Sequence, residues 1–454
     1  MRHFLSPISL ATTGHPCEED SGARAQRELD VSASRVCIHA LRAVREDVRA
    51  QRSAMALAGA GFAVEVIDVA HGSAVSREEA LVDIVGKNVI PPEMLQIAAS
   101  PVRHIIMPGW LTRYYDPTNY IGWLLFKSWR MLRATAQLLQ TPSDIYHASD
   151  VAALLPCYIA ARVRRKPLVF DAHELPLVEL HYTQSAARRA LNGISARLLR
   201  AMLSQCAGIM TVSPPLVREL RRRYGGKQAV LVRNVPVYRA PQASDRLRQR
   251  LGLGVDTHIA LYQGYLQPDR GLDGLVRAAR YLDRDIVIVI LGGGASQAEV
   301  ERLIAQEGVA DRVRILPAVP YAELLDWTAS ADIGLIVARP THSANVEVFL
   351  PNKLFEYLIA GLPVLTSPLE AVIDVIQAHD VGRVMPSLEP EVLARAINDM
   401  LADCPGLARM RANALCAAKT ALRWDIEQQK LLDLYHAIVR HPAKSCAEAK
   451  EVAI

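Results

Sequence analysis

The stretch VFLPNKLFEYLIAGLPVL, residues 348–365, combines groups that can do chemistry with a short helix suited to burial. Glu356 is the one acid in this stretch, and Lys353 lies near the start of the expected helix, Asn352–Ala360. A buried carboxylate is costly unless it accepts hydrogen bonds. Pro351 fits the start of a helix, where its missing N–H is not needed, and the unpaired amides of a first turn favour an anion. Taken alone, this stretch fits either a ligand site or a structural helix with an acid at its exposed edge.

Two further loops carry titratable side chains directly after predicted strands. Asp150 lies in YHASDVA (146–152), and His173 and Glu174 lie in FDAHELP (170–176). Ligands of parallel sheets bind beyond the carboxyl ends of the strands, so both loops are candidate catalytic loops. Taken alone, a histidine after a strand is more often structural than catalytic.

The elements that must position these residues begin after Ser34, where the pattern becomes repetitive. An amphipathic run from Glu46 to Ala60, stopped by Gly59 and Gly61, predicts a helix. Apolar runs predict strands at 36–40, 62–69, 144–148, 167–173, 208–213 and 229–234. Strands that alternate with helices favour a parallel sheet.

A second series of the same kind follows the Arg- and Gln-rich segment 238–253. Strands are predicted at 259–264, 286–293, 313–317, 333–337 and 363–367, with helices at Gly271–Leu282 and Gln297–Glu307 among the connections. The fold class is therefore α/β, with two Rossmann-like parallel-sheet domains facing a cleft.

The predicted domain organisation follows from these two series. We expect a flexible extension at 1–32, a first domain at 33–238, a second domain at 239–423 and a tail at 441–454. The last helix, at 424–440, is long enough to cross back onto the first domain.

The composition is that of a globular protein too long for one compact core, with 454 residues, 51% of them apolar and 22% charged. No run of 18 apolar residues occurs, and Met1–Asp20 is not a convincing secretion signal, so we expect a cytoplasmic protein. The seven cysteines form no C-x-x-C pair, which favours reduced thiols over disulfides or a zinc site.

Positive charge is concentrated in one part of the chain. Between Val102 and Ala240 there are 20 lysines and arginines against 7 acidic residues, whereas the whole chain has a formal charge of +5. No nucleic-acid-binding motif accompanies this surplus, so we expect no nucleic-acid partner. An anionic membrane surface or a phosphate-bearing substrate fits the charge as well or better.

One predicted helix, 121–140, belongs to this basic region. Its aromatic and basic side chains recur at spacings of three: Trp123, Phe126, Trp129, Lys127, Arg130 and Arg133. The pattern occurs in helices that lie in a membrane interface, but core packing with a solvated basic stripe is the more common cause of it.

Six stretches of the chain carry a wider resemblance. In order they are REDVRAQRSAMALAGAGFAVEVI, DIYHASDVAALLPCYIAARVRRKPLVFDAHEL, GIMTVSPPLVRELRRRYG, LYQGYLQPDRGLDGLVRAARYL, LGGGASQAEVERL and LPNKLFEYLIAGLPVLTSP. Their order and spacing resemble GT-B glycosyltransferases of the retaining family 4 type, also called group 1 glycosyl transferases, from Ser34 to Arg440. The resemblance implies transfer of a sugar from a nucleoside-diphosphate sugar.

The resemblance also implies a donor site in the second domain. Glu356 would accept hydrogen bonds from the two ribose hydroxyls, and the amides at the start of its helix would bind the diphosphate. Arg270 stands where the family has a lysine and would clamp the diphosphate, with Lys353 as a second cation, whereas Tyr265 replaces a family arginine. The donor-binding residues implied are Gly264, Arg270, Asn345, Pro351, Asn352, Lys353, Leu354 and Glu356.

The chain departs from the family pattern eight residues before Glu356. The family usually has an acid there that contacts the sugar, and this chain has Val348. Asn345, Glu347 and a main-chain amide are the alternatives for that contact.

In the first domain the resemblance assigns His173 and Asp150 to the sugar or acceptor, and it favours a functional over a structural role for His173. Asp47, Arg49 and Glu174 would face the acceptor; for the first two, a plain charge pair at a helix start is equally consistent. The predicted catalytic set is His173, Asp150, Arg270 and Glu356.

The reaction implied is transfer with retention, by attack on the same face of the sugar, with the leaving phosphate accepting the acceptor's proton. The donor would be a UDP- or GDP-sugar, and the acceptor a glycan or a lipid-linked molecule. We expect no other cofactor and no metal, since no Asp-x-Asp motif lies in a suitable loop. Peripheral association with an anionic membrane, at its inner face, fits the basic first domain.

Three other functions are compatible with parts of the pattern. A nucleotide-sugar epimerase has a similar two-domain fold, and a non-catalytic sugar-nucleotide-binding protein would tolerate Val348 and Tyr265. A dinucleotide dehydrogenase is suggested by LGGGASQAEVE alone, whose glycine spacing is not Gly-x-Gly-x-x-Gly.

Overall fold

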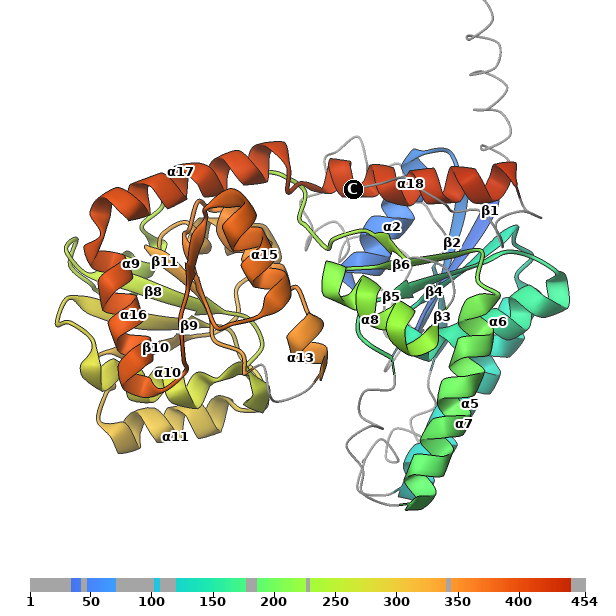
Figure 1. The fold of residues 1–454 in the computed structure, drawn as a ribbon, viewed down its shortest axis with the longest axis horizontal. Coiled ribbons are helices and arrows are strands. Elements are labelled where there is room, and N and C mark those ends of the chain that lie inside the picture. Colours follow the sequence, from blue (N-terminus) through green and yellow to red (C-terminus); the bar gives the residue numbers. More distant parts are fainter. Residues whose placement is uncertain are drawn as a thin grey trace, which may run out of the picture.

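The computed structural model describes residues 34–41, 47–70, 102–106, 120–176, 186–225, 229–339 and 344–441. These residues form two α/β units that lie side by side, each built on a parallel sheet (Figure 1). The fold class predicted from the sequence is confirmed. The ends expected to be flexible, 1–32 and 441–454, lie outside the described residues apart from His441.

The first unit contains a seven-stranded sheet with the order β3-β2-β1-β4-β5-β6-β7. Its strands are β1 (Arg35–Ala40), β2 (Ala63–Ala70), β3 (Val102–Ile106), β4 (Ile145–Ser149), β5 (Leu168–Ala172), β6 (Gly208–Thr211) and β7 (Val230–Leu231). Its helices are α2 (Val48–Gly59), α5 (Tyr120–Gln140), α6 (Val151–Arg164), α7 (Ala186–Ser204) and α8 (Pro214–Tyr224). Every residue of β4, β5 and β6 is buried, as expected of parallel strands covered on both faces.

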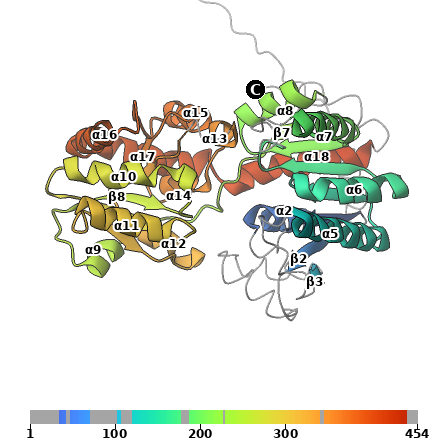
Figure 2. The ribbon, with the colours of Figure 1, turned by 90° about the horizontal axis from the view of Figure 1, so that it is seen from below.

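The second unit contains a six-stranded sheet with the order β10-β9-β8-β11-β12-β13. Its strands are β8 (His258–Gln263), β9 (Ile286–Leu291), β10 (Val313–Leu316), β11 (Ile333–Ile336), β12 (Val364–Thr366) and β13 (Gly382–Val384). Its helices include α9 (Arg246–Leu251), α10 (Leu272–Ala278), α11 (Gln297–Glu307), α12 (Tyr321–Thr328), α13 (Ala344–Val348), α14 (Asn352–Ile359), α15 (Glu370–His379) and α16 (Pro390–Ala402). Figure 2 shows α10 and α16 on one side of this sheet and α9 and α12 on the other.

Each sheet has a switch point, where the chain changes direction along the sheet. In the second unit β8 is hydrogen-bonded to β9 on one side and β11 on the other, and in the first unit β1 lies between β2 and β4. Ligands of doubly wound sheets bind outside the carboxyl ends at such points. The switch point of the second unit therefore lies at the loop after β8, and that of the first unit lies at the loop after β4, next to the loop after β5.

The end of the chain ties the two units together. Helix α17 (Cys404–Thr420) packs on α14 of the second unit, and α18 (Trp424–Arg440) packs on α2 and β7 of the first. Figure 1 shows α17 running along the second unit and α18 along the first. Glu427 of α18 is fully buried and accepts hydrogen bonds from Arg233, through its amide at 2.9 Å and Nη1 at 3.0 Å. The chain passes from the first unit to the second after β7 and returns between α17 and α18. The amide of Trp424 donates to the carbonyl of Pro236, so these two connections lie next to each other.

Candidate functional site

A cavity of about 630 Å³ lies between the two units. Its size is in the range of small-molecule binding sites. Among the predicted site residues, it is lined by Asp47, Arg49, His173, Glu174, Gly264, Arg270, Pro351, Asn352, Lys353 and Glu356. Asp150, Asn345 and Leu354 are not among its lining residues. Chain segments far apart in sequence therefore converge on one cavity.

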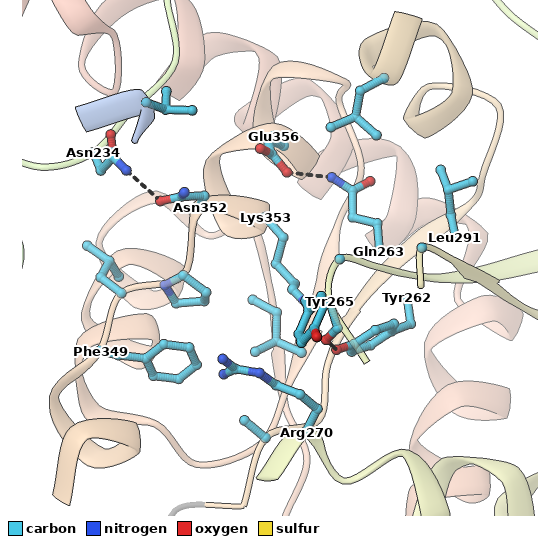
Figure 3. A pocket seen from close by; sticks show the side chains of 18 of the residues that line it. Asn234, Tyr262, Gln263, Tyr265, Arg270, Leu291, Phe349, Asn352, Lys353 and Glu356 are labelled. Carbon is cyan, nitrogen blue, oxygen red and sulfur yellow. Dashed lines mark hydrogen bonds between the residues drawn. The ribbon is translucent and has the colours of Figure 1, made fainter. Parts of the chain in front are cut away.

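Glu356 is held by a series of hydrogen-bonded side chains on the second-unit side of the cavity. Its Oε2 accepts a hydrogen bond of 2.6 Å from Nε2 of Gln263, the last residue of β8 (Figure 3). Gln263 is itself fixed, because its Oε1 accepts from Oγ1 of Thr328 at 2.8 Å. Burial raises the pKa of Glu356 above its usual value of 4.5, against the opposing effects of Gln263, Arg52 and Lys353.

The start of α14 offers donors to an anion. Pro351 precedes the helix, and no side chain caps its first amides. The neighbouring Asn352 accepts a hydrogen bond of 2.9 Å at Oδ1 from Nδ2 of Asn234, as Figure 3 shows. Leu354, predicted to bind the donor, points its fully buried side chain into the core, and its amide donates to the carbonyl of Pro351 at 3.0 Å. Its role toward the donor stays a prediction.

Two cations of the cavity lie against aromatic rings. Nζ of Lys353 is 3.7 Å from the centre of the Tyr262 ring, and the guanidinium of Arg270 lies 5.3 Å from that of Phe349 (Figure 3). An aromatic face holds a cation without neutralising its charge. Both side chains are therefore placed near the first turn of α14 with positive charge for an anionic ligand.

Two glycines allow the loops after β8 and β9 to approach each other. Gly264 has a φ of 122°, and a Cβ there would lie 3.4 Å from Nζ of Lys353. A Cβ on Gly292 would lie 2.1 Å from the carbonyl oxygen of Gly264, which no real contact allows. Side chains at these positions would push the backbone away from the cavity.

The first-unit wall is organised around Asp171, which is fully buried. Its carboxylate accepts two hydrogen bonds of 2.7 Å from Arg49, and Nε2 of His173 lies 3.4 Å from Oδ2. Arg49 also donates to the carbonyl of Val232 at 2.7 Å. Burial disfavours the ionised form of Asp171, but Arg49 and His173 outweigh it and lower its pKa. The guanidinium of Arg49 thus makes its hydrogen bonds within the protein, to Asp171 and Val232.

Two predicted acids lie at helix starts. Asp47 caps α2 by accepting from the amide of Ala50 at 3.0 Å, and its side chain lines the cavity. Asp150 caps α6 with a φ of 73° and accepts from the amide of Val151 at 2.7 Å. The capping role accounts for Asp150 without a ligand; its role toward the sugar or acceptor stays a prediction.

Helix α13 docks onto the first unit. Asn345 accepts a hydrogen bond of 2.8 Å from the amide of Leu175 and donates one of 3.1 Å to Oε2 of Glu174. Val348 is 6% exposed and packs within the hydrophobic cluster of the first unit, while its carbonyl accepts from Ser213 at 2.5 Å. The position at which an acid was expected by resemblance is occupied by an apolar contact between the units.

Three residues of this region were not predicted. Gln263 and Asp171 are polar residues at the ends of apolar strands, which is the signal that could have found them. Arg52 is 5% exposed and donates to Oδ1 of Asn234 at 2.8 Å and to the hydroxyl of Tyr321 at 3.3 Å. No sequence pattern marks it. Burial lowers the pKa of Arg52, opposed by Tyr321 and Glu356.

A metal centre has no support in the part of the chain that the structure describes. No group of three or more His, Cys, Asp or Glu side chains there could hold a metal ion.

Comparison with known proteins adds to this geometry. Residues 48–236 match the family model described as Glycosyltransferase Family 4, and residues 243–415 match the model described as Glycosyl transferases group 1. A D-inositol 3-phosphate glycosyltransferase of Xylanimonas cellulosilytica is 32% identical over 46% of this chain, which spans about half (49%) of that relative. One from Catenulispora acidiphila is 25% identical over 67% of this chain and 75% of its own length.

Solved structures share the fold. HepE of Anabaena, crystallised with UDP and glucose, has a TM-score of 0.66 at 17% identity, covering 89% of this chain and 100% of its own. A sucrose-phosphate synthase of Thermosynechococcus elongatus has a TM-score of 0.67 at 16% identity, covering 90% and 99%. At these identities the likeness concerns the fold.

Proposed function

Because the chain belongs to the GT-B glycosyltransferases of group 1 and family 4, we propose that it transfers a sugar from a nucleoside-diphosphate sugar to an acceptor. The observation that carries this proposal is the second-unit wall of the cavity. A fixed carboxylate, Glu356, lies on the same short helix as Lys353, and Arg270 lines the cavity with them. Ribose hydroxyls and a diphosphate are the groups that such a wall recognises.

The proposed donor binding assigns one part of the nucleotide to each feature. Glu356, held by Gln263, accepts hydrogen bonds from the ribose hydroxyls. The amides at the start of α14 and the cations Arg270 and Lys353 bind the diphosphate, with Arg270 stabilising the charge that grows as the nucleotide leaves. The donor is a UDP- or GDP-sugar; UDP has support from the complexes of HepE, a protein of the same fold.

The proposed acceptor side is the first-unit wall, with His173, Asp47 and Glu174. Transfer proceeds with retention, and the leaving phosphate takes the proton of the attacking hydroxyl. The acceptor is a glycan, a lipid-linked molecule or another phosphate-bearing alcohol. A phosphate on the acceptor would suit the basic segment between Val102 and Ala240, which has 20 lysines and arginines against 7 acidic residues. D-inositol 3-phosphate, named for the relatives, belongs in the acceptor panel.

The proposed reaction needs no metal, since cations of the protein itself meet the diphosphate. EDTA should therefore leave the rate unchanged. A loss of turnover with EDTA that magnesium or manganese restores would show that a divalent ion takes part.

A peripheral membrane association is proposed for the basic first unit. None of the helices that the structure describes is both long and apolar enough to cross a bilayer. On α5, Leu125 and Leu132 are 59% and 70% exposed and lie beside exposed Lys127 and Arg133, whereas Phe126 is buried. Co-sedimentation with vesicles containing anionic lipid, lost at high salt, tests this association.

The experiment that tests the function combines binding with turnover. Thermal shift against UDP, GDP and their sugars identifies the nucleotide, since a ligand at 100 times its Kd stabilises the fold by about 2.7 kcal/mol. Transfer is then measured with the acceptor panel. Epimerised sugar nucleotide in the absence of acceptor would favour an epimerase, and binding without turnover would favour a non-catalytic protein.

A further inference from the structure

His173, on the first-unit wall, is held by a buried network that starts behind it. Its Nε2 faces the Oδ2 of Asp171 at 3.4 Å and the hydroxyl of Ser149 at 3.4 Å. The side chain is 20% exposed and lines the cavity, whereas the side chain of Asp171 is 1% exposed. One nitrogen of the imidazole is thus engaged by the protein interior, and the ring reaches the cavity.

Asp171 is itself held in a single orientation. The two 2.7 Å hydrogen bonds from Nε and Nη2 of Arg49 form a bidentate pair, and Arg49 is anchored to the carbonyl of Val232. A bidentate guanidinium fixes the plane of a carboxylate. Arg49 therefore orients Asp171, and Asp171 orients His173.

We propose that Asp171 is a positioning residue that fixes His173 as an imidazolium, so that its second N–H is presented to the sugar nucleotide in the cavity. This inference rests on the proposed function, because it assigns His173 a contact with the substrate of that reaction. Asp171 does not line the cavity and acts through His173.

The charges around His173 favour its protonated form. Asp171 on β5 and Asp47, just before α2, are the facing acids, Arg49 on α2 is the opposing cation, and Ser149 on β4 is uncharged. Burial works against protonation, but the two acids outweigh it, and the pKa of His173 is raised above 6.5.

The other histidine beside Asp171 adds no charge. Burial lowers the pKa of His147 to about 4, although Asp171 opposes this shift, so His147 is neutral at physiological pH. Its Nδ1 lies 2.6 Å from the hydroxyl of Tyr435 on α18. Asp171 thus has one imidazole partner that stays neutral and one, His173, whose protonation it favours.

The test is the pH dependence of Asp171→Asn. The amide keeps the shape of Asp171 but removes the charge, so the pKa of His173 falls toward or below 6.5 while burial and Arg49 still oppose protonation. At pH values above the pKa of His173, each unit by which that pKa falls lowers the fraction of imidazolium about tenfold. We expect kcat of the variant, at saturating UDP-glucose, to be about tenfold lower than the parent's at pH 8 and within about threefold at pH 6. A merely structural role would lower kcat equally at both pH values.

A matched control is Asp144→Asn. Asp144 comes directly before β4, at the amino ends of the strands and so opposite to the cavity, where it accepts from the amide of Arg35 at 3.0 Å and from Lys166 at 2.9 Å. Its ratio of variant to parent kcat should not change with pH. Effects of pH on Glu356 are common to variant and parent and cancel in these ratios.

A second readout needs no turnover. The NMR signal of His173, assigned by its loss in His173→Gln, should titrate above pH 6.5 in the parent and at lower pH in Asp171→Asn. A parent His173 that titrates below 6.5 overturns the inference even if the variant does not fold, and so does a kcat ratio that is flat with pH. If His173 titrates as expected but no sugar nucleotide is turned over, the proposed function fails and not the pairing of Asp171 with His173.

Discussion

Replacing Glu356 by glutamine tests the donor site most directly. The substitution keeps the shape of the side chain and a partner for Gln263, whose Nε2 lies 2.6 Å from the carboxylate. It removes the negative charge that the ribose hydroxyls are proposed to meet. Nucleotide binding should therefore weaken while the surrounding structure stays in place.

The size of the effect follows from the hydrogen bonds that lose their charge. Hydrogen bonds to charged groups contribute about 1.5–3 kcal/mol, so the Kd for UDP should rise by about 10- to 150-fold. The fold should not weaken. Burial raises the pKa of Glu356, so the ionised acid costs stability as pH rises through that pKa, and Glu356→Gln should have an equal or higher Tm at neutral pH.

Isothermal titration calorimetry with bare UDP and GDP measures this effect without an acceptor. In the parent, affinity should fall as pH decreases through the raised pKa of Glu356, because the protonated acid is a poorer acceptor, and in Glu356→Gln this component should be absent. The matched control is Glu299→Gln, an exposed acid on α11 that does not line the cavity.

One result would refute the reasoning. If Glu356→Gln bound UDP and GDP as tightly as the parent while the parent bound either of them well, Glu356 would not be the ribose acceptor. Glu356 would then be a structural partner of Gln263.

Three further predictions concern other parts of the site and the fold. Arg270→Ala should lower kcat by about 10²- to 10³-fold with a smaller change in UDP affinity, as steady-state kinetics and calorimetry would show, because its charge is used most as the nucleotide leaves. Gln263→Met should weaken UDP binding by about 1–3 kcal/mol in calorimetry, since Glu356 loses its orienting partner. Glu427→Ala should destabilise the protein by about 3 kcal/mol in denaturant unfolding, because Arg233 loses a fully buried partner.

Controls for these three variants lie on exposed helix surfaces. Each substitution is repeated at an exposed position that does not line the cavity: Arg395→Ala on α16, Gln429→Met on α18 and Glu391→Ala on α16. The first prediction is contradicted if Arg270→Ala is as fast as the parent. The second is contradicted if Gln263→Met binds UDP with unchanged Kd, and the third if Glu427→Ala is as stable as the parent.

The strands were predictable because parallel strands buried on both faces appear as continuous apolar runs. IVIVIL of β9 and LVFDA of β5 are examples, and the carboxyl ends of such strands located the loops of the cavity. Two strands escaped prediction. VRHII of β3 contains arginine and histidine, and β13 has three residues, GRV, too few for a period to appear.

The polar network of the site was not predictable, because its partners are far apart in sequence. Arg49 and Asp171 are 122 residues apart, Gln263 and Glu356 are 93 apart, and Arg52 and Asn234 are 182 apart. A single residue with such a partner looks like an ordinary surface charge or a helix cap. Arg49 illustrates this, since the predicted helix-start charge is in fact turned inward to Asp171.

Val348 is where the structure changes the interpretation of the sequence most. As a departure from a family pattern, valine at this position looks like a missing acid. In the structure Val348 is 6% exposed within the hydrophobic cluster of the first unit, and its carbonyl is bonded to Ser213. A carboxylate there would be buried without a cation among the apolar side chains of that cluster, which costs several kcal/mol unless it stays protonated or the contact opens.

Val348→Glu should therefore separate α13 from the first unit instead of restoring a sugar contact. We expect a lower Tm, a larger radius of gyration in small-angle scattering and slower transfer, because the two walls of the cavity no longer face each other. Val348→Ala, which leaves a gap but no charge, should lower Tm by less and keep the radius of gyration. If Val348→Glu transferred sugar faster than the parent at an unchanged radius of gyration, the acid would be reaching the sugar, and the apolar contact would be dispensable for closing the cavity.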